Sequence, residues 1–143
     1  MNKLQFQKTS SPVVQPMKVL LDTHALVWWL EDAGRLSRRA ATILANLDNS
    51  ILVSAVVGWE IAIKVSAGKM QPRSILQGLD RVLEQQSFSQ LPITLDAAVR
   101  ASLLPPHHRD PFDRLLVAQA QSLNMPILSA DRILDQYGVK RLW

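Results

Sequence analysis

The sequence predicts one α/β domain, a doubly wound parallel β-sheet with helices on both of its faces. Short apolar runs alternate with longer stretches of helical periodicity, which is the pattern of strand–helix–strand units joined by right-handed crossovers. The chain has 143 residues, of which 48% are hydrophobic and 20% charged, enough to bury one sizeable core. We expect residues 17–143 to form this single domain, and residues 1–16, which lack periodicity, to form a flexible N-terminal tail.

Composition excludes several kinds of site. Because the chain contains no cysteine, it has no disulfide, thiolate metal site or cysteine nucleophile, and a cytoplasmic location is expected. No apolar run approaches the roughly 18 residues of a membrane span, and the N-terminus lacks the apolar centre of a signal peptide. The net charge is +4 overall but +2 from Met17 onward, which is only weak support for a nucleic-acid partner.

The first apolar run, residues 19–21, predicts a buried strand. Asp22 follows at its carboxyl end, where a helix is expected to begin and to continue through residue 30. Ser37 is a typical N-cap residue, so a second helix is expected from there to about Leu47, with its apolar side chains on one face.

The next run, residues 51–53, is short and rich in β-branched side chains, which predicts a second buried strand. Ser54 then caps a helix that Gly68 is expected to close. A further helix is predicted over residues 74–86.

Two helices are predicted in the following segment. The first covers residues 94–104 and is stopped by a pair of prolines. The second starts at Asp110, because an aspartate at the N-cap with Pro111 at the first helical position is a strong start signal. Its helical pattern continues to about residue 124.

The last predicted strand covers residues 126–129, and Asp131 follows its end. In open parallel sheets, ligands collect outside the carboxyl ends of the strands. Asp22 and Asp131 are both predicted to lie at this edge.

Four carboxylates from four separate elements form a candidate site, although each also has a structural interpretation. Asp22 and Asp131 are each equally well explained as helix caps. Glu60 is equally well explained by an exposed pair with Lys64 one turn later. Asp113 is also favourably placed near a positive helix N-terminus. It is their combination that points to chemistry.

Clustered carboxylates require a cation, since otherwise some of them would take up protons. Their hard oxygen atoms suit Mg²⁺ or Mn²⁺ better than zinc. One or two such ions activate water and stabilise charge in phosphodiester hydrolysis, so the cluster is typical of a metal-dependent hydrolase.

The segments that carry these acids resemble the four successive acidic motifs of PIN domains, and most closely those of VapC-type toxin ribonucleases of toxin–antitoxin pairs. The four segments are LLDTHAL, SAVVGWEIAIK, DPFDRLLVAQA and LSAD. The resemblance implies a PIN-like fold over residues 17–143, an RNA substrate and a need for Mg²⁺ or Mn²⁺. It also implies a homodimer and a small antitoxin that covers the active-site groove.

Carried over position by position, the resemblance assigns Asp22, Glu60, Asp113 and Asp131 to the catalytic, metal-binding site. Asp22 and Asp113 are the surest metal ligands. Asp110 falls where these toxins often have a second aspartate, but helix capping explains it adequately.

Three further residues are expected to contact substrate. Thr23 follows the first aspartate and is assigned to orienting a ligand or water, with a capping role as the alternative. Arg109 lies just before the helix that carries Asp113, where it is expected to bind RNA phosphate. Arg114 adjoins the acidic site and is expected to hold substrate or a carboxylate.

The histidines and tryptophans are better explained by structural roles than by metal binding or base stacking. The three histidines, His24, His107 and His108, lack the H-x-x-x-H spacing of a zinc site, and the last two are expected in a solvated loop, with RNA contact as the alternative. The tryptophans Trp28, Trp29 and Trp59 stand among aliphatic residues at helical spacing, which favours core or interface over base stacking.

Other functions fit less well. A haloacid-dehalogenase-like phosphatase also uses an aspartate at the tip of its first strand, but it requires a second acid two residues later, where this chain has His24. A dinucleotide-binding fold is excluded because the five glycines form no Gly-rich fingerprint. The remaining alternative is a catalytically silent PIN-like module that binds RNA or protein.

Overall fold

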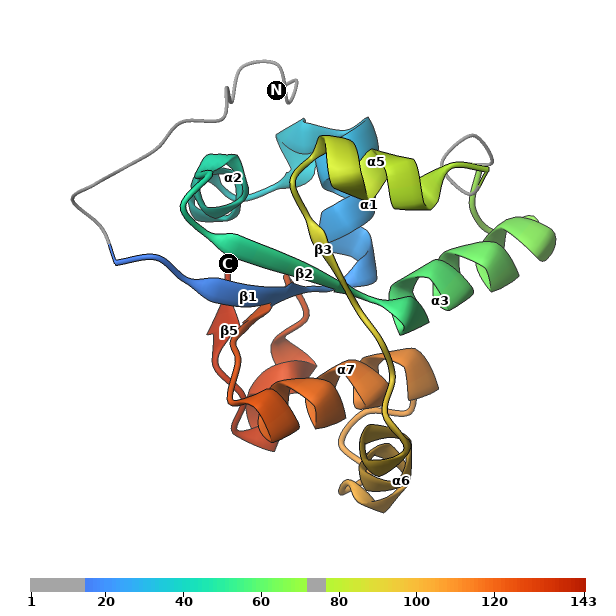
Figure 1. Cartoon of the computed structure of the whole chain (residues 1–143). Coiled ribbons are helices and arrows are strands. Elements are labelled where there is room, and N and C mark those ends of the chain that lie inside the picture. The colour runs from blue at the N-terminus through green and yellow to red at the C-terminus, as the bar shows by residue number, and fades with distance from the viewer. Residues whose placement is uncertain (1–14, 72–76) are drawn as a thin grey trace.

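The computed structural model describes residues 15–71 and 77–143. They form a five-stranded, fully parallel sheet in the order β3-β2-β1-β4-β5 (Figure 1). The strands are β1 (Lys18–Leu21), β2 (Ser50–Ser54), β3 (Ser89–Leu91), β4 (Ile127–Leu128) and β5 (Arg141–Leu142). The predicted α/β class is therefore confirmed.

The central strand β1 is also where the winding reverses. Successive strands β2 and β3 lie on one side of β1, whereas β4 and β5 lie on the other. Leu21 at the end of β1 pairs with Val53 of β2 and with Leu128 of β4. The carboxyl ends of β1 and β4 thus meet at the topological switch point, the usual position of a ligand site in such sheets.

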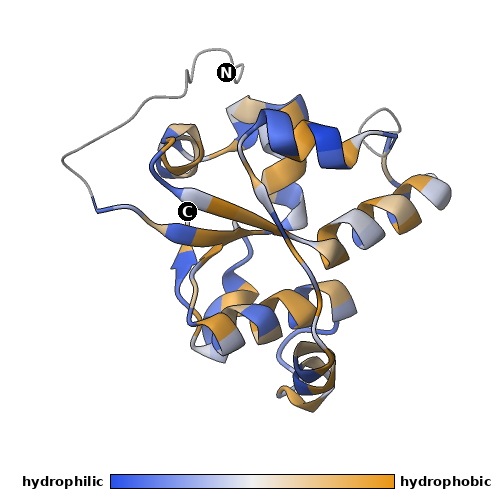
Figure 2. Ribbon diagram, in the orientation of Figure 1, coloured by the Kyte–Doolittle hydropathy of each residue, from blue (hydrophilic) through white to orange (hydrophobic). Residues whose placement is uncertain are grey.

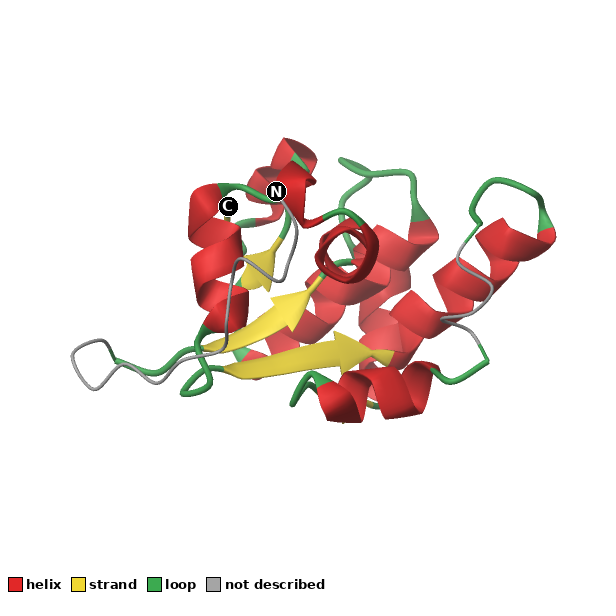
Figure 3. Cartoon of the chain, turned by 90° about the horizontal axis from the view of Figure 1, so that it is seen from above, coloured by secondary structure: helices red, strands yellow, loops and turns green. Residues whose placement is uncertain are grey.

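Helices cover both faces of the sheet, as predicted. They are α1 (Thr23–Glu31), α2 (Arg38–Ala45), α3 (Ala55–Ser66), α5 (Leu79–Gln85), α6 (Leu95–Leu103) and α7 (Pro111–Leu123), with 3₁₀ turns η2 (Ala33–Arg35) and η3 (Arg132–Tyr137). Helices α1, α2 and α5 lie on one side of the sheet, and α6 and α7 on the other (Figure 1). Seen from above, the strands run in one direction among the helices (Figure 3).

Local side-chain chemistry starts most of these helices. Asp22, Ser37, Ser54, Thr94 and Asp110 each occupy an N-cap, where a side-chain oxygen accepts a hydrogen bond from a backbone N–H of the first turn. Such a bond satisfies an amide that otherwise has no partner in the helix. All five positions were expected to start helices from the sequence.

Helix ends and edge strands differ more from the predictions. The second helix ends at Ala45, so the predicted boundary at Leu47 is wrong; Leu47 is 47% exposed and does not extend the apolar face. Of the helix predicted over residues 74–86, residues 74–76 lie outside the described part, and α5 occupies Leu79–Gln85. Strands β3 and β5 were not predicted, because they are two or three residues long and have no apolar run.

The predicted N-terminal tail lies mostly outside the described residues, which begin at position 15. The backbone N–H of Met17 donates to the Asn49 side chain at 2.9 Å, and the Met17 carbonyl accepts from Ser50. These bonds tie the backbone at Met17 to the start of β2.

The core lies between the sheet and its helices. The apolar side chains of β1 are 0% exposed, and hydrophobic residues line the strands and the helix sides that face them (Figure 2). Trp29 is buried, as a core position predicts, whereas Trp59 is 58% exposed and packs edge-on against Phe112. Within residues 15–71 and 77–143, no helix is long and apolar enough to cross a membrane.

Candidate active site

Asp22 lies at the carboxyl end of β1 and is 6% exposed. Its backbone N–H donates to the Leu128 carbonyl, its Oδ1 accepts from the backbone N–H of Ala25 at 2.8 Å, and the Ser129 side chain is hydrogen-bonded to its carboxylate. Asp22 is therefore a helix cap, as the alternative interpretation required. It is also a buried carboxylate at the switch point, and capping fixes its direction.

Burial raises the pKa of Asp22 above its ordinary value, and the charge of Glu60 adds to this effect. The hydrogen bonds from Ser129 and Ala25 and the charge of His24 oppose it without cancelling it. The ionised form of Asp22 is thus costly here, which is the condition under which a carboxylate gains most from a bound cation.

Asp113 is in the first turn of α7, with a side chain that is 20% exposed. Burial and the charge of Asp110 raise its pKa to about 7, with smaller contributions from Glu60 and Asp22 and an opposing one from His108. Asp113 therefore takes up a proton more readily than an ordinary aspartate, and a bound cation would favour its ionised form.

Glu60, on α3, is 2% exposed and has both carboxylate oxygens hydrogen-bonded within the protein. Oε1 accepts from the Thr23 hydroxyl and Oε2 from the Lys64 ammonium, each at 2.5 Å. The pair with Lys64 that the sequence offered as an alternative is present, but on the Glu60 side it is buried instead of exposed. Because the Glu60 charge raises the pKa of both Asp22 and Asp113, Glu60 belongs to the same cluster.

Lys64 is the cation of this cluster. Partial burial alone would lower the pKa of Lys64, but the hydrogen bond and charge of Glu60, with the charges of Asp110 and Asp113, raise it. The ammonium group therefore faces the acidic residues, with 26% of the side chain exposed.

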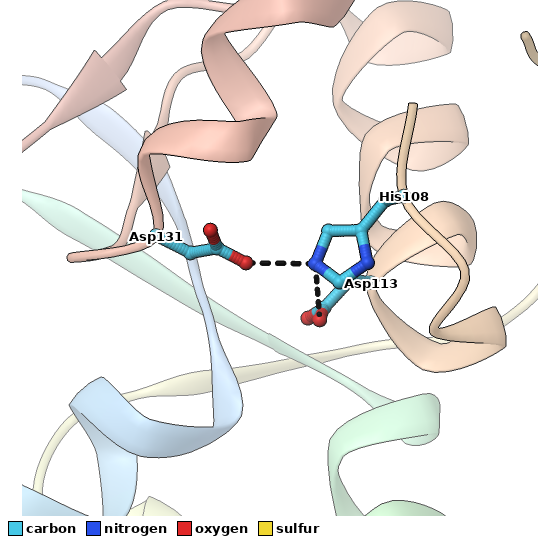
Figure 4. Close-up of side chains that lie close together, drawn as sticks. All are labelled: His108, Asp113 and Asp131. Atoms are coloured by element: carbon cyan, nitrogen blue, oxygen red, sulfur yellow. Dashed lines mark hydrogen bonds and ion pairs between the residues drawn. The ribbon is translucent and has the colours of Figure 1, made fainter. Parts of the chain in front are cut away.

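Asp131 follows β4 and is joined to Asp113 by His108 (Figure 4). Its Oδ1 caps η3 by accepting from Ile133, while its Oδ2 lies 2.7 Å from His108 Nε2. The same nitrogen is 3.1 Å from Asp113 Oδ2. The three side chains can present one ligand atom each within 4.8 Å of one another.

The structure couples Asp22, Glu60 and Asp113 by charge and joins Asp131 to Asp113 through His108. Among the described residues, the group whose ligand atoms all lie within 4.8 Å of one another contains Asp113, Asp131 and His108, and neither Asp22 nor Glu60 belongs to it.

Sequence reasoning did not name Ser129, and it treated Lys64 only as an exposed partner of Glu60 and His108 as a loop residue. Ser129 and Lys64 lie inside two of the recognised motifs, which was an available signal. For His108 the predicted solvated loop is wrong, because only 13% of its side chain is exposed and its Nε2 lies against Asp131.

Two residues predicted to contact substrate, Thr23 and Arg114, form hydrogen bonds within the protein. Thr23 is 2% exposed and its hydroxyl donates to Glu60, so it positions that carboxylate. The Arg114 guanidinium donates to five backbone carbonyls, those of Ala101, Ser102, Leu104, Pro105 and His108. These bonds commit Arg114 to the end of α6 and the loop after it. Arg109, by contrast, is exposed and remains open to a ligand.

The donor set fits a hard divalent cation. Asp22, Asp113 and Asp131 supply carboxylate oxygens, the ligand type of Mg²⁺ and Mn²⁺. Burial is the main cause of the raised pKa of both Asp22 and Asp113, and neighbouring carboxylates add to it, so a bound cation would favour the ionised form of each.

A parallel sheet wound in both directions from β1, with buried acids at its switch point, defines an α/β protein with an acidic ligand site at the carboxyl ends of its strands. The particular family follows from comparison with known proteins: residues 19–140 match the model of the PIN domain, and this chain belongs to that family. It is 30% identical over 121 residues to Ribonuclease VapC22 from Mycobacterium tuberculosis, covering 83% of this chain and 91% of that protein.

Solved structures agree with this fold. The chain resembles VapBC2 of Rickettsia felis, solved bound to a promoter DNA fragment, with a TM-score of 0.66 and 15% identity over 88% of this chain and 98% of that one. It also resembles FitAcB of Neisseria gonorrhoeae, with a TM-score of 0.59 and 17% identity over 87% and 96%. The predicted PIN-like fold is confirmed.

Proposed function

We propose that this protein is a metal-dependent ribonuclease that acts as the toxin of a toxin–antitoxin pair. The observation that carries the proposal is the carboxylate cluster at the switch point, where buried Asp22 and half-buried Asp113 both have a raised pKa, in each case mainly because of burial. The ribonuclease relative, similar along most of its length, supports RNA as the substrate.

Asp22 and Asp113 would hold the metal ion, with Asp131 as a further oxygen donor. Glu60 belongs to the same site; its two oxygens accept from Thr23 and Lys64, and each keeps a further lone pair for a metal ion or a bound water. A divalent ion of the Mg²⁺ or Mn²⁺ type supplies activation of water and neutralisation of charge on a phosphodiester.

The chain's own residues prepare the site for that chemistry. Asp22 is held by its cap to α1 and the Asp113 carboxylate by its contact with His108, so neither carboxylate has to be ordered when RNA binds. Arg109 is exposed beside this helix and is proposed to bind a backbone phosphate, a contact that positions RNA without reading its sequence.

The similarity to known structures also suggests which proteins this chain pairs with. The similar structures include VapBC2 of Rickettsia felis, and we propose that this chain likewise pairs with a small antitoxin and forms a homodimer in the cytoplasm. Light scattering of the purified chain tests the dimer, and a monomer at all concentrations would contradict it.

The decisive experiment compares the parent protein with Asp22→Asn on a mixed pool of structured RNA, with Mg²⁺ or Mn²⁺ and with EDTA. Asparagine also caps helices well, so the variant is expected to fold while losing a metal-binding oxygen. We expect cleavage to fall at least 100-fold in the variant and to vanish in EDTA. Asp96→Asn, which alters an exposed carboxylate on α6, is the matched control and should cleave normally.

The alternative is a silent PIN-like module that binds RNA or protein without cleaving. Folded, antitoxin-free protein that cleaves no RNA with either metal would favour that module. Full cleavage by Asp22→Asn would remove Asp22 from the site.

A further inference from the structure

His108 lies between two acids that come from separate parts of the fold. Its Nε2 atom is 2.7 Å from Asp131 Oδ2 and 3.1 Å from Asp113 Oδ2, and only 13% of its side chain is exposed (Figure 4). Asp113 belongs to α7, whereas Asp131 follows β4, 18 positions later in the chain. Among the described residues, this imidazole is the group that spans the two carboxylates.

The other ring nitrogen identifies the tautomer. The backbone N–H of Asp110 donates to His108 Nδ1 at 3.1 Å, so Nδ1 presents its lone pair and carries no proton. The proton of the neutral ring is therefore on Nε2, where it is donated to Asp131 Oδ2. A proton on Nδ1 would instead bring two N–H groups face to face.

The backbone of His108 is hydrogen-bonded through both its N–H and its carbonyl group. The backbone N–H of His108 donates to the Tyr137 hydroxyl at 2.8 Å, and that hydroxyl donates to the Pro105 carbonyl at 2.8 Å. The His108 carbonyl accepts from Arg114 at 3.3 Å. The direction of the imidazole is thus set by the protein backbone and not by the carboxylates it meets.

We propose that His108 is a positioning residue, which holds the carboxylates of Asp113 and Asp131 side by side through its Nε2–H and does not itself bind the metal. This inference rests on the proposed function, which assigns those acids to the metal site. Ligation requires an imidazole lone pair, but that of Nδ1 is occupied by the Asp110 amide, and Nε2 carries the proton.

The role proposed for His108 affects which kind of metal ion the site favours. A histidine ligand would make a mixed nitrogen and oxygen site, which favours zinc, nickel or cobalt, whereas a site of oxygen ligands alone favours Mg²⁺ and Mn²⁺. By keeping its nitrogen atoms engaged in the protein, His108 keeps the coordination of the ion to oxygen. Partners of this kind around metal ligands change metal affinity by about 10–100-fold when they are lost.

Two substitutions separate the two ring nitrogens. In His108→Gln, a side-chain NH₂ group replaces the Nε2–H donor, while in His108→Asn a side-chain oxygen replaces the Nδ1 acceptor and the donor is lost. We expect Mn²⁺ affinity, measured by calorimetry on the full chain, to stay within about threefold in His108→Gln and to fall about tenfold or more in His108→Asn. Asp96→Asn, at an exposed carboxylate on α6, is the control and should bind Mn²⁺ normally.

Two spectra of the parent protein test the proton position and the metal coordination of His108 directly. Nitrogen-15 NMR of the metal-free chain should show His108 with a protonated Nε2 and an unprotonated Nδ1. Pulsed electron paramagnetic resonance of the Mn²⁺-loaded chain should show no directly coordinated nitrogen. A coordinated-nitrogen signal that disappears in both His108 variants, or unchanged Mn²⁺ affinity in His108→Asn, would overturn the proposal.

These outcomes are separate from the failure of the proposed function. Oxygen-only Mn²⁺ coordination without RNA cleavage would support the role of His108 and contradict the ribonuclease. Cleavage by a chain whose Mn²⁺ is bound by His108 would support the ribonuclease and contradict the role of His108.

Discussion

Glu60 and Lys64 illustrate how one residue pair serves both stability and the site. Glu60 is 2% exposed, and its two carboxylate oxygens accept hydrogen bonds from the side chains of Thr23 and Lys64. A buried pair of this kind adds little net stability, because both charges lose water when they come together. Breaking it is costly, because the remaining charge stays buried alone.

Lys64→Met should therefore lower the free energy of unfolding by about 2–4 kcal/mol, somewhat less than for a fully buried pair because Lys64 is partly exposed. Adding Glu60→Gln should restore most of that loss, since no unpaired charge then remains. Urea unfolding measures both variants. The exposed pair of Asp96 and Arg100 has the same i,i+4 spacing, and Arg100→Met is expected to cost no more than about 0.5 kcal/mol. Equal losses at both lysine and arginine positions would contradict the buried-pair argument.

At the scale of elements, Arg114 joins α7 to the end of α6. The last carbonyls of a helix have no partner within it, and the Arg114 guanidinium supplies donors to those of Ala101 and Ser102 and to three more in the following loop. The same loop carries His108. Arg114 therefore links the stability of a helix end to the geometry of the acidic site.

Arg114→Lys keeps the charge but loses the planar fork that reaches several carbonyls at once. We expect a loss of about 1–3 kcal/mol in the free energy of unfolding, because polar groups are left unpaired. Arg109→Lys, at an exposed arginine, should change stability by less than about 0.5 kcal/mol. Weaker RNA binding by Arg114→Lys at unchanged stability would instead restore the substrate role that the sequence predicted.

Elements differ in how far the sequence predicts them. Helix starts are local, since an N-cap such as Thr94 or Asp110 bonds an amide two or three residues away, and these were predicted correctly. Strands β3 and β5 depend on pairing with β2 and β4 and carry little pattern of their own. The acids could be predicted from strand ends and motifs. His108 could not, because its contact with Asp131 spans 23 positions and depends on how the loop packs.

On the scale of the whole molecule, the acidic site is a source of instability that a metal ion would remove. The pKa of Asp113 is raised from 3.8 to about 7 by burial and neighbouring charge. A pKa raised by folding means that the protonated form favours the folded state. Protonated Asp113 therefore contributes its full stabilisation of the folded state below about pH 4. In the metal-free protein this contribution is lost as the pH rises through about 7. Asp22 shifts in the same direction.

Metal binding should show the opposite dependence on pH, because ligation requires ionised carboxylates. We expect Mn²⁺ to raise Tm little at pH 6 and substantially at pH 8, where an ion at about a hundred times its Kd stabilises by about 2.7 kcal/mol, or roughly 5–10 °C. Differential scanning fluorimetry with Mn²⁺ and with EDTA measures both effects. Asp113→Asn should be more stable than the parent in EDTA at pH 8 and should respond little to Mn²⁺, while Asp96→Asn should behave as the parent does. If EDTA-treated parent and Asp113→Asn lose stability equally between pH 6 and 8, the strain attributed to Asp113 is absent and its assignment as a metal ligand loses its main support.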